Sequence, residues 1–176
     1  MKNAHFFYRN IANNKMYILV LLFILVIVVL YSYFYLKPPR MFNIIQLPID
    51  QLHPQYLFEK NPIIVNESLH DPNDLSSRLF KWLYVSQKTL VSHKDYDIKT
   101  WSRYAVVHPT QGTCFVQIRA PYTYQTIDVK LRQNQILVLP YLWQCNGKGN
   151  EIRVTFYHDI ISLFFGKIFG SFENTK

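Results

Sequence analysis

The chain has 176 residues, 49% of them hydrophobic, and a length that suits one membrane anchor with one modest domain and excludes two globular domains. The formal net charge is +8, but the 19 lysines and arginines are scattered rather than gathered into a stripe, which argues against a nucleic-acid-binding protein. Two cysteines and five glycines exclude a disulfide-stapled or low-complexity scaffold.

Residues 16–36 form an apolar run without charge, proline or glycine, MYILVLLFILVIVVLYSYFYL. At about 1.5 Å per residue, a helix of this length spans a hydrocarbon core about 30 Å thick. Lipid offers the peptide groups no hydrogen-bond partner, so the segment must be helical. Tyrosines near both ends and the flanking Lys15 and Lys37 suit the two membrane interfaces. We therefore predict a single-pass transmembrane helix that follows an N-terminal tail of residues 1–15.

A cleaved signal peptide is the alternative reading of this run. The run is longer than the usual apolar core of about 7–15 residues, and no small-residue cleavage site follows it, so we expect an uncleaved anchor. Basic residues are slightly more numerous before the run than after it, a bias toward a cytosolic N-terminus that is too small to decide the orientation.

Pro38 and Pro39 should end the helix, because proline cannot donate a backbone hydrogen bond, and residues 37–41 then form a stiff spacer. A β domain is expected over residues 42–158. Short β-rich runs alternate there with turn signals such as 108–112 and 146–150, which favours an antiparallel β-sandwich or barrel with one or two packed helices. The predicted strands are 42–47, 62–66, 89–92, 104–108, 113–119, 126–132, 135–139 and 151–158.

Two helices are expected beside these strands. The first covers residues 72–87, with Asp71 as its N-cap, Pro72 at its first position and an apolar stripe that packs on a sheet. The second lies in the phenylalanine-rich segment 159–176, which is too short to cross a bilayer. Three arrangements are open for this segment: it could pack on its own sandwich, lie on a membrane surface, or dock into a partner protein. Its apolar face contains Ile161, Phe164, Phe165, Ile168 and Phe172.

Residues 45–65 are typical of a short strand and helix that lead into a strand with proline followed by hydrophobic residues, NPIIV. Later in the chain, the hydrophobic segment ILVLPYLWQ at 136–144 is followed by a second one, IRVTFY, at 152–157. These segments resemble the N-terminal approach and the late hairpin of cupin-like proteins of the JmjC type. The resemblance implies a cupin-like domain. In active members of that family, a His-x-Asp/Glu pair and a later His hold an iron ion that binds 2-oxoglutarate and oxygen.

The sequence departs from that iron site. Gln144, a poor iron ligand, stands where the resemblance places the later His. His93-Lys94-Asp95 matches the His-x-Asp pattern but lies in a polar segment, and His108 and His158 are expected at strand ends. We therefore expect no metal, no cofactor, no catalytic residue and no enzymatic activity. A membrane-anchored iron- and 2-oxoglutarate-dependent oxygenase that uses His93 and Asp95 stays the alternative.

A short Asn-, Ile-, Lys- and Tyr-rich chain with an anchor and a compact cupin-like domain looks like small membrane-anchored virion proteins of the large nucleocytoplasmic DNA viruses. The resemblance implies a minor capsid or virion membrane component that links an internal viral membrane to capsid proteins. We expect a structural protein whose partners are the lipid bilayer and other proteins. The candidate contact residues are Tyr122, Tyr124, Tyr141, Trp143, Trp101 and Arg103. For the first four, partial burial in the core is the alternative and the more common situation of such side chains.

Two further features leave alternatives open. Cys114 and Cys145 pair only if the fold brings them together, and two buried free thiols are the simpler expectation. The sequon Asn66-Glu67-Ser68 matters only in a lumenal domain, where glycosylation would favour a type II secretory-pathway protein that binds a ligand in its barrel.

Overall fold

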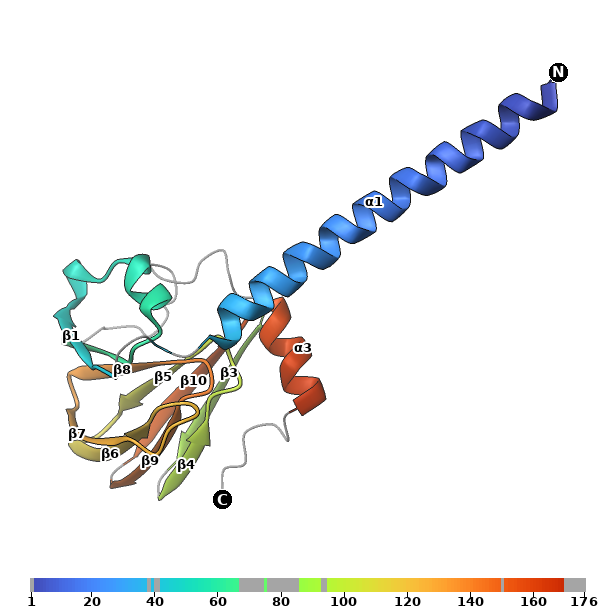
Figure 1. The fold of residues 1–176 in the computed structure, drawn as a ribbon. Coiled ribbons are helices and arrows are strands. Elements are labelled where there is room, and N and C mark those ends of the chain that lie inside the picture. The colour runs from blue at the N-terminus through green and yellow to red at the C-terminus, as the bar shows by residue number, and fades with distance from the viewer. Residues whose placement is uncertain are drawn as a thin grey trace. The chain divides into compact units, whose positions relative to one another are not determined.

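The computed structural model describes residues 2–37, 39, 42–66, 75, 86–92, 95–149 and 151–169. The chain divides into two compact units, residues 1–37 and 38–176. The first unit is the helix α1, Lys2–Leu36 (Figure 1). It ends before Pro38 and Pro39, as predicted, but the predicted tail belongs to the same helix from Lys2 onward.

The central part of α1 has the properties of a membrane span. Residues 15–33 have a mean hydropathy of 2.7, and none of this stretch is buried inside the protein. Among the described residues, this is one helix long and apolar enough to cross a bilayer. Such length and composition are shared by a transmembrane anchor and an N-terminal signal sequence.

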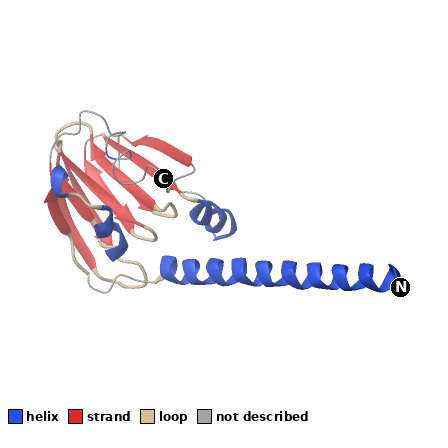
Figure 2. Cartoon of the chain, turned by 90° about the horizontal axis from the view of Figure 1, so that it is seen from above, coloured by secondary structure: helices blue, strands red, loops and turns tan. Residues whose placement is uncertain are grey.

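The second unit is mainly β, and Figure 2 shows its strands gathered into a sandwich. A six-stranded sheet has the order β1-β2-β8-β5-β10-β3, and a four-stranded sheet has the order β4-β9-β6-β7. The strands are β1 Ile45–Pro48, β2 Ile63–Asn66, β3 Ser86–Ser92, β4 Tyr96–Lys99, β5 Tyr104–Pro109, β6 Thr113–Arg119, β7 Thr126–Arg132, β8 Gln135–Pro140, β9 Gln144–Gly149 and β10 Ile152–His158.

The strand order from β3 to β10 is that of a jelly roll. The chain changes sheets at every connection in this stretch except the β6–β7 hairpin, which gives β8-β5-β10-β3 facing β4-β9-β6-β7. Two interlocked Greek keys of eight strands produce this arrangement, which cupins share. β1 and β2 extend the larger sheet beside β8 and pair in parallel. The expected β-sandwich with a cupin-like architecture is confirmed.

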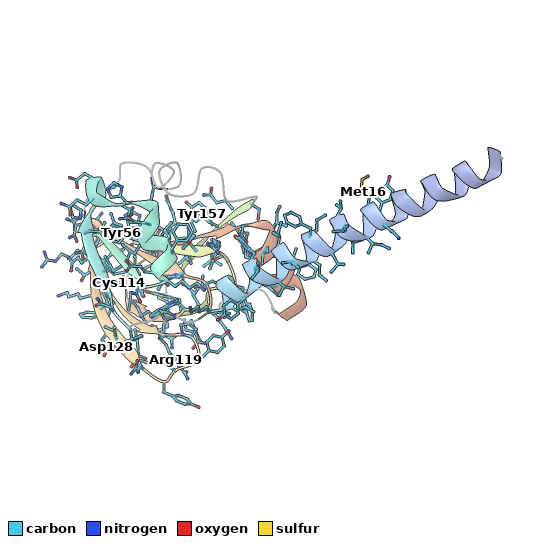
Figure 3. All side chains as sticks on the ribbon, turned by 45° about the horizontal axis from the view of Figure 1, so that its top comes forward. Met16, Tyr56, Cys114, Arg119, Asp128 and Tyr157 are labelled. Carbon is cyan, nitrogen blue, oxygen red and sulfur yellow. The ribbon has the colours of Figure 1, made fainter. Side chains whose placement is uncertain are left out.

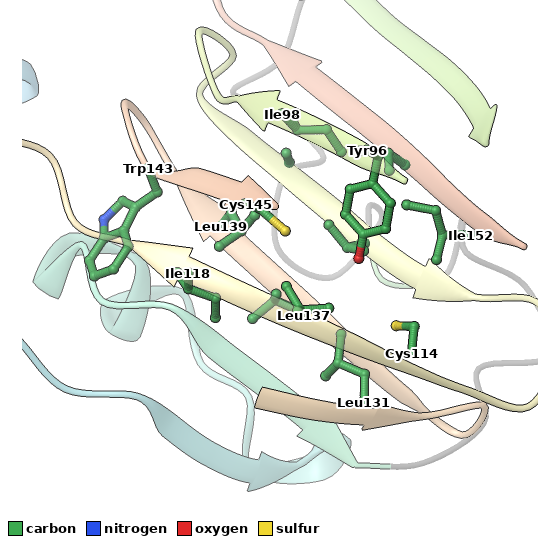
Figure 4. Close-up of a cluster of buried hydrophobic side chains, with 14 of the residues drawn as sticks. Tyr96, Ile98, Cys114, Ile118, Leu131, Leu137, Leu139, Trp143, Cys145 and Ile152 are labelled. Carbon is green, nitrogen blue, oxygen red and sulfur yellow. The ribbon is translucent and has the colours of Figure 1, made fainter. Parts of the chain in front are cut away.

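Two hydrophobic cores hold this unit together. The first fills the space between the sheets, with aliphatic side chains from both (Figure 4). The second lies on the other face of the six-stranded sheet, under the 3-10 helices η1, Ile49–Gln51, and η2, Pro54–Glu59. Because both faces of this sheet are covered, β5 and β8 are almost continuously buried rather than alternating.

The structure corrects several predicted elements. β4 was not predicted, and the predicted turn 146–150 is occupied as far as Gly149 by β9. Most of the predicted helix 72–87 lies outside the described residues. Leu75 is described, and it is helical and fully buried. Ser86 and Gln87 are also described, and they belong to the strand β3. The predicted C-terminal end of this helix was therefore wrong.

The C-terminal helix α3, Ile160–Phe169, contacts β10. Ser162 and Gly166 are its buried positions, Ile161 and Phe165 are half-buried, and Phe164 is exposed. The helix thus packs on its own sandwich, the first of the three expected arrangements, with Ser162 and Gly166 buried and Leu163 half-buried, while Phe164 of the predicted apolar face points to solvent. The side chain of Ile168 and all of Phe172 lie outside the described residues.

Candidate functional site

The interior of the sandwich does not have the composition of an iron site. The side chains that meet between the sheets include Ile98, Val116, Ile118, Leu137 and Leu139, which are hydrocarbons without a metal-binding atom. Across the described part of the chain, no three His, Cys, Asp or Glu side chains are grouped so that they hold a metal ion. The described side chains of this interior therefore do not fit an iron ion.

The residues considered for iron are also scattered. His108 on β5 pairs with Arg153, whereas His158 is the last residue of β10, so the two imidazoles lie toward opposite ends of the larger sheet. Burial lowers the pKa of both. Gln144 and Asp95 border two separate hollows of the four-stranded sheet. His93 and Lys94 lie outside the described residues.

The outer face of the four-stranded sheet is polar and ordered in rows. On a strand, alternate side chains share a face, so the cross-strand register defines which of them lie side by side. What we name the basic row consists of Lys99, Gln144, Arg119 and Thr126, from β4, β9, β6 and β7. What we name the acidic row lies two residues along each strand and consists of Asp97, Asn146, Gln117 and Asp128.

A hollow of about 810 Å³ lies over the acidic row. Within it, the Gln117 amide donates a hydrogen bond of 2.9 Å to the Asp128 carboxylate. Phe115 borders the hollow with 61% of its surface exposed, and the Lys130 ammonium lies 5.5 Å from the centre of its ring. The hollow therefore combines carboxylates, amides and an open aromatic face.

The loop between β6 and β7, residues 120–125, projects at the other end of this face and borders a second hollow of about 320 Å³. Tyr122 is 70% and Tyr124 is 92% exposed. The Arg119 guanidinium donates to the Thr123 carbonyl at 3.2 Å and lies 5.2 Å from the centre of the Tyr124 ring. These contacts hold the loop in one conformation while both tyrosines face solvent. Figure 3 labels Arg119 and Asp128 at the same side of the domain.

The structure sorts the predicted contact residues. Tyr122 and Tyr124 are exposed, so they remain candidate contact residues. Tyr141 and Trp143 are buried, which agrees with the alternative expectation that they are core residues and removes them as contact candidates. The Trp143 indole donates to the Lys60 carbonyl at 3.0 Å and stacks on Phe42, with ring centres 5.5 Å apart. It is a core residue because it closes one end of the sandwich.

The remaining two candidates have structural partners. Trp101 is half-buried, packs edge-on against Tyr141, and has the Lys99 ammonium 4.8 Å above its ring. Arg103 forms an ion pair of 3.9 Å with Asp159. Both residues connect parts of the sandwich, so they contribute less to an outer contact surface than the two tyrosines.

A buried polar cluster lies inside the sandwich and was not predicted. The Tyr96 ring points toward the thiols of Cys114 and Cys145 (Figure 4). Both thiols are free and buried, the simpler of the two expectations. Burial raises the pKa of Tyr96 and of both cysteines, so these groups stay uncharged and unreactive at neutral pH.

No protein-family model and no curated protein matches this chain. Among solved structures, an 11S allergen from Cocos nucifera L. is 16% identical, with a TM-score of 0.35, over 57% of this chain and 28% of that protein. An 11S globulin from Wrightia tinctoria, whose structure reveals an auxin binding site, is 15% identical, with a TM-score of 0.34, over 57% of this chain and 26% of that protein. The chain thus spans about a quarter of the length of these proteins. Similarity this low carries no argument about function, and the fold assignment rests on the strand order.

Proposed function

We propose that this chain is a membrane-anchored structural protein that binds other proteins through the outer face of its four-stranded sheet. The β6–β7 loop carries this proposal, because it exposes two tyrosines beside Arg119 and Lys99. Tyrosine and arginine dominate the energetics of protein interfaces, since they bury large areas with few rotamers to freeze or pair in several directions.

The membrane half of the proposal rests on the span 15–33. Its exposed apolar side chains run continuously from Met16 to Leu30, and hydrocarbon of this extent is stable only in lipid or under a protein cover. An anchor fixes the sandwich at one bilayer. In its finer form, the proposal places the protein on an internal virion membrane as a minor capsid component that links this membrane to capsid proteins.

A structural role also agrees with the contents of the sandwich. An oxygenase needs an open metal site, and a ligand-binding barrel needs an internal cavity, whereas the described side chains between the sheets are mainly hydrocarbons that surround the buried Tyr96, Cys114 and Cys145. Chemistry and ligand recognition are therefore favoured less than contacts made by the surface.

Two experiments test the proposal on the full chain in the membranes of its host cell. Alkaline carbonate should leave the full chain in the membrane pellet, whereas a chain that lacks residues 1–37 should be released. A photo-crosslinking amino acid at Tyr124 should then join the protein to one or a few discrete protein partners.

The control for the second experiment is the same photo-crosslinker at Val91, which is exposed on β3 of the other sheet. We expect no discrete product from that position. A full chain that carbonate releases, or equal crosslinking from Val91 and Tyr124, would contradict the proposed function.

A further inference from the structure

The outer face of the four-stranded sheet carries opposite charges in adjacent rows. Lys99 and Arg119 belong to the basic row, and Asp97 and Asp128 belong to the acidic row. Neighbouring residues on one face of a strand are about 6.6 Å apart along the strand, so the two rows are close but distinct. Across these two rows the charge therefore changes from positive to negative along the strands, and the row beyond the acidic one contains Phe115 and Lys130.

Such a face is complementary to itself. When two copies meet face to face about a two-fold axis that runs across the strands between the rows, the basic row of one copy lies over the acidic row of the other. Lys99 of each copy then faces Asp97 of its partner, and Arg119 faces Gln117 beside Asp128. Each attraction occurs twice, which is the property of an isologous interface.

The shape of the face agrees with the same axis. The β6–β7 loop projects beyond the basic row, and the hollow of about 810 Å³ extends beyond the acidic row to Phe115. The axis that exchanges the rows brings the loop of one copy over the hollow of the other. Tyr122 and Tyr124 would then cover the Phe115 ring, so that the aromatic surfaces exposed in one copy are buried in the pair.

We propose that this face pairs with the same face of a second copy of the chain, with basic row over acidic row. The proposal rests on the proposed function insofar as it takes this face as a protein-contact surface. Strand spacing gives the face an area of roughly 500 Å², below the about 800 Å² per partner of a standard interface, so pairing is weak in dilute solution. A shared bilayer raises the effective concentration and favours it.

A charge-swap experiment tests the pairing. The full chain, labelled at its amino terminus with donor or acceptor dye, is reconstituted in neutral phosphatidylcholine vesicles, and energy transfer is measured against protein density. The variant K99E/R119E has acids in both rows, and D97K/D128K has bases in both. Each variant alone should pair about tenfold more weakly than the wild type, because repulsion replaces attraction at both symmetric contacts.

Mixing the two variants is the decisive measurement. Acidic rows then face basic rows again, so energy transfer between the variants should return to within about twofold of the wild-type value. K88E/R153E makes the same change in net charge on the other sheet and should leave wild-type pairing unchanged. Thermal melting of each variant confirms that it is folded, and the mixture gives the answer even where one variant is less stable.

Two results would overturn the inference. One is wild-type energy transfer no greater than that of either like-charge variant, and the other is a mixture that stays as weak as its components. Either result would contradict self-pairing but not the proposed function, provided that Tyr124 still crosslinks to a different protein. Release of the full chain by carbonate would instead contradict the proposed function.

Discussion

At the scale of single residues, Gly147 and Tyr96 fit closely against each other inside the sandwich. They are register partners on β9 and β4, and a Cβ atom at Gly147 would overlap the Tyr96 ring. A glycine inside a strand ordinarily weakens it, and here it makes room for a buried aromatic ring. The absence of a side chain at Gly147 thus allows the Tyr96 ring to lie in the core.

Gly147→Ala should lower the free energy of unfolding by about 1–3 kcal/mol, the usual cost of overpacking a closely packed interior. Urea denaturation of residues 38–176, the unit that contains both cores, measures this difference. Tyr96→Leu removes the ring atoms that the new methyl group meets. In the Tyr96→Leu background, the added alanine should therefore cost less than in the wild type, and an equal cost in both would refute the overlap.

The cluster of Tyr96, Cys114 and Cys145 predicts a loss of stability at alkaline pH. Burial raises the pKa of each group in the folded state above its ordinary value, 9.0 for cysteine and 10.0 for tyrosine. Below pH about 8, both the folded and the unfolded states are protonated and stability is unaffected. Above pH about 9, the unfolded state loses protons that the folded state retains, so the free energy of unfolding falls as pH rises.

Melting temperatures of residues 38–176 between pH 7 and pH 11 should therefore stay level and then decline. Tyr96→Phe removes the hydroxyl but keeps the ring, so its decline should be shallower than that of the wild type. Identical pH profiles for the two proteins would show that Tyr96 contributes nothing to the alkaline transition.

At the scale of elements, α3 begins at a reciprocal cap. The Ser162 N–H donates to the Asp159 carboxylate at 2.7 Å, and the Asp159 N–H donates to the Ser162 hydroxyl at 2.9 Å. These two bonds satisfy backbone donors that a helix start leaves without partners. Arg103, which lies just before β5, forms an ion pair with the same carboxylate, so the cap also connects α3 to the sandwich.

Asp159→Ala should lower the free energy of unfolding by about 1–2 kcal/mol, because it removes a helix cap whose partners are buried. Ser162→Ala should lower the free energy of unfolding by about as much, because it breaks the reciprocal bond. The control is Asp50→Ala, an exposed acid in η1, with an expected change within about 0.5 kcal/mol. Equal effects of Asp159→Ala and Asp50→Ala in urea denaturation would contradict the capping role.

Elements with a local pattern were predictable, whereas those determined by distant contacts were not. β6 and β7 follow the expected 113–119 and 126–132, because their alternation of exposed and buried side chains is written in the sequence. β9 contains Asn146-Gly147-Lys148-Gly149, which is typical of a turn, but it is a strand because it pairs with both β4 and β6, which are distant in the sequence.

The candidate site divides in the same way. The sequence named Tyr122 and Tyr124 as contact candidates, but only the structure separates them, as exposed loop residues, from the buried Tyr141 and Trp143. The burial of Trp143 depends on a carbonyl 83 residues away in the sequence, a contact that no local pattern shows. The basic and acidic rows likewise arise only from the register of β4, β9, β6 and β7. Of these strands, only β6 and β7 are consecutive in the chain.

At the scale of the whole molecule, the chain joins two units whose apolar side chains are covered in different ways. Residues 38–176 bury two hydrophobic cores of their own, whereas the span 15–33 buries none of its apolar surface inside the protein. A transmembrane anchor and a signal sequence both expose such a stretch, so α1 could cross a membrane as either one. Under the proposed function, α1 is the anchor, and the sandwich stays at the membrane only while α1 is attached.

Retention of α1 is the last prediction. Protein purified from membranes should have the intact mass of 21.0 kDa, because an uncleaved anchor keeps every residue of the chain. Arginines at Ile24 and Ile27, near the centre of the span, should each cost about 2.5–3.5 kcal/mol of insertion and move the chain to the carbonate-soluble fraction. The same two arginines at Tyr17 and Tyr33, near its ends, reach the interface and should leave the chain in the membrane. A mature protein that begins after residue 36 would identify the helix as a signal sequence and would remove the anchor from every proposal that depends on it.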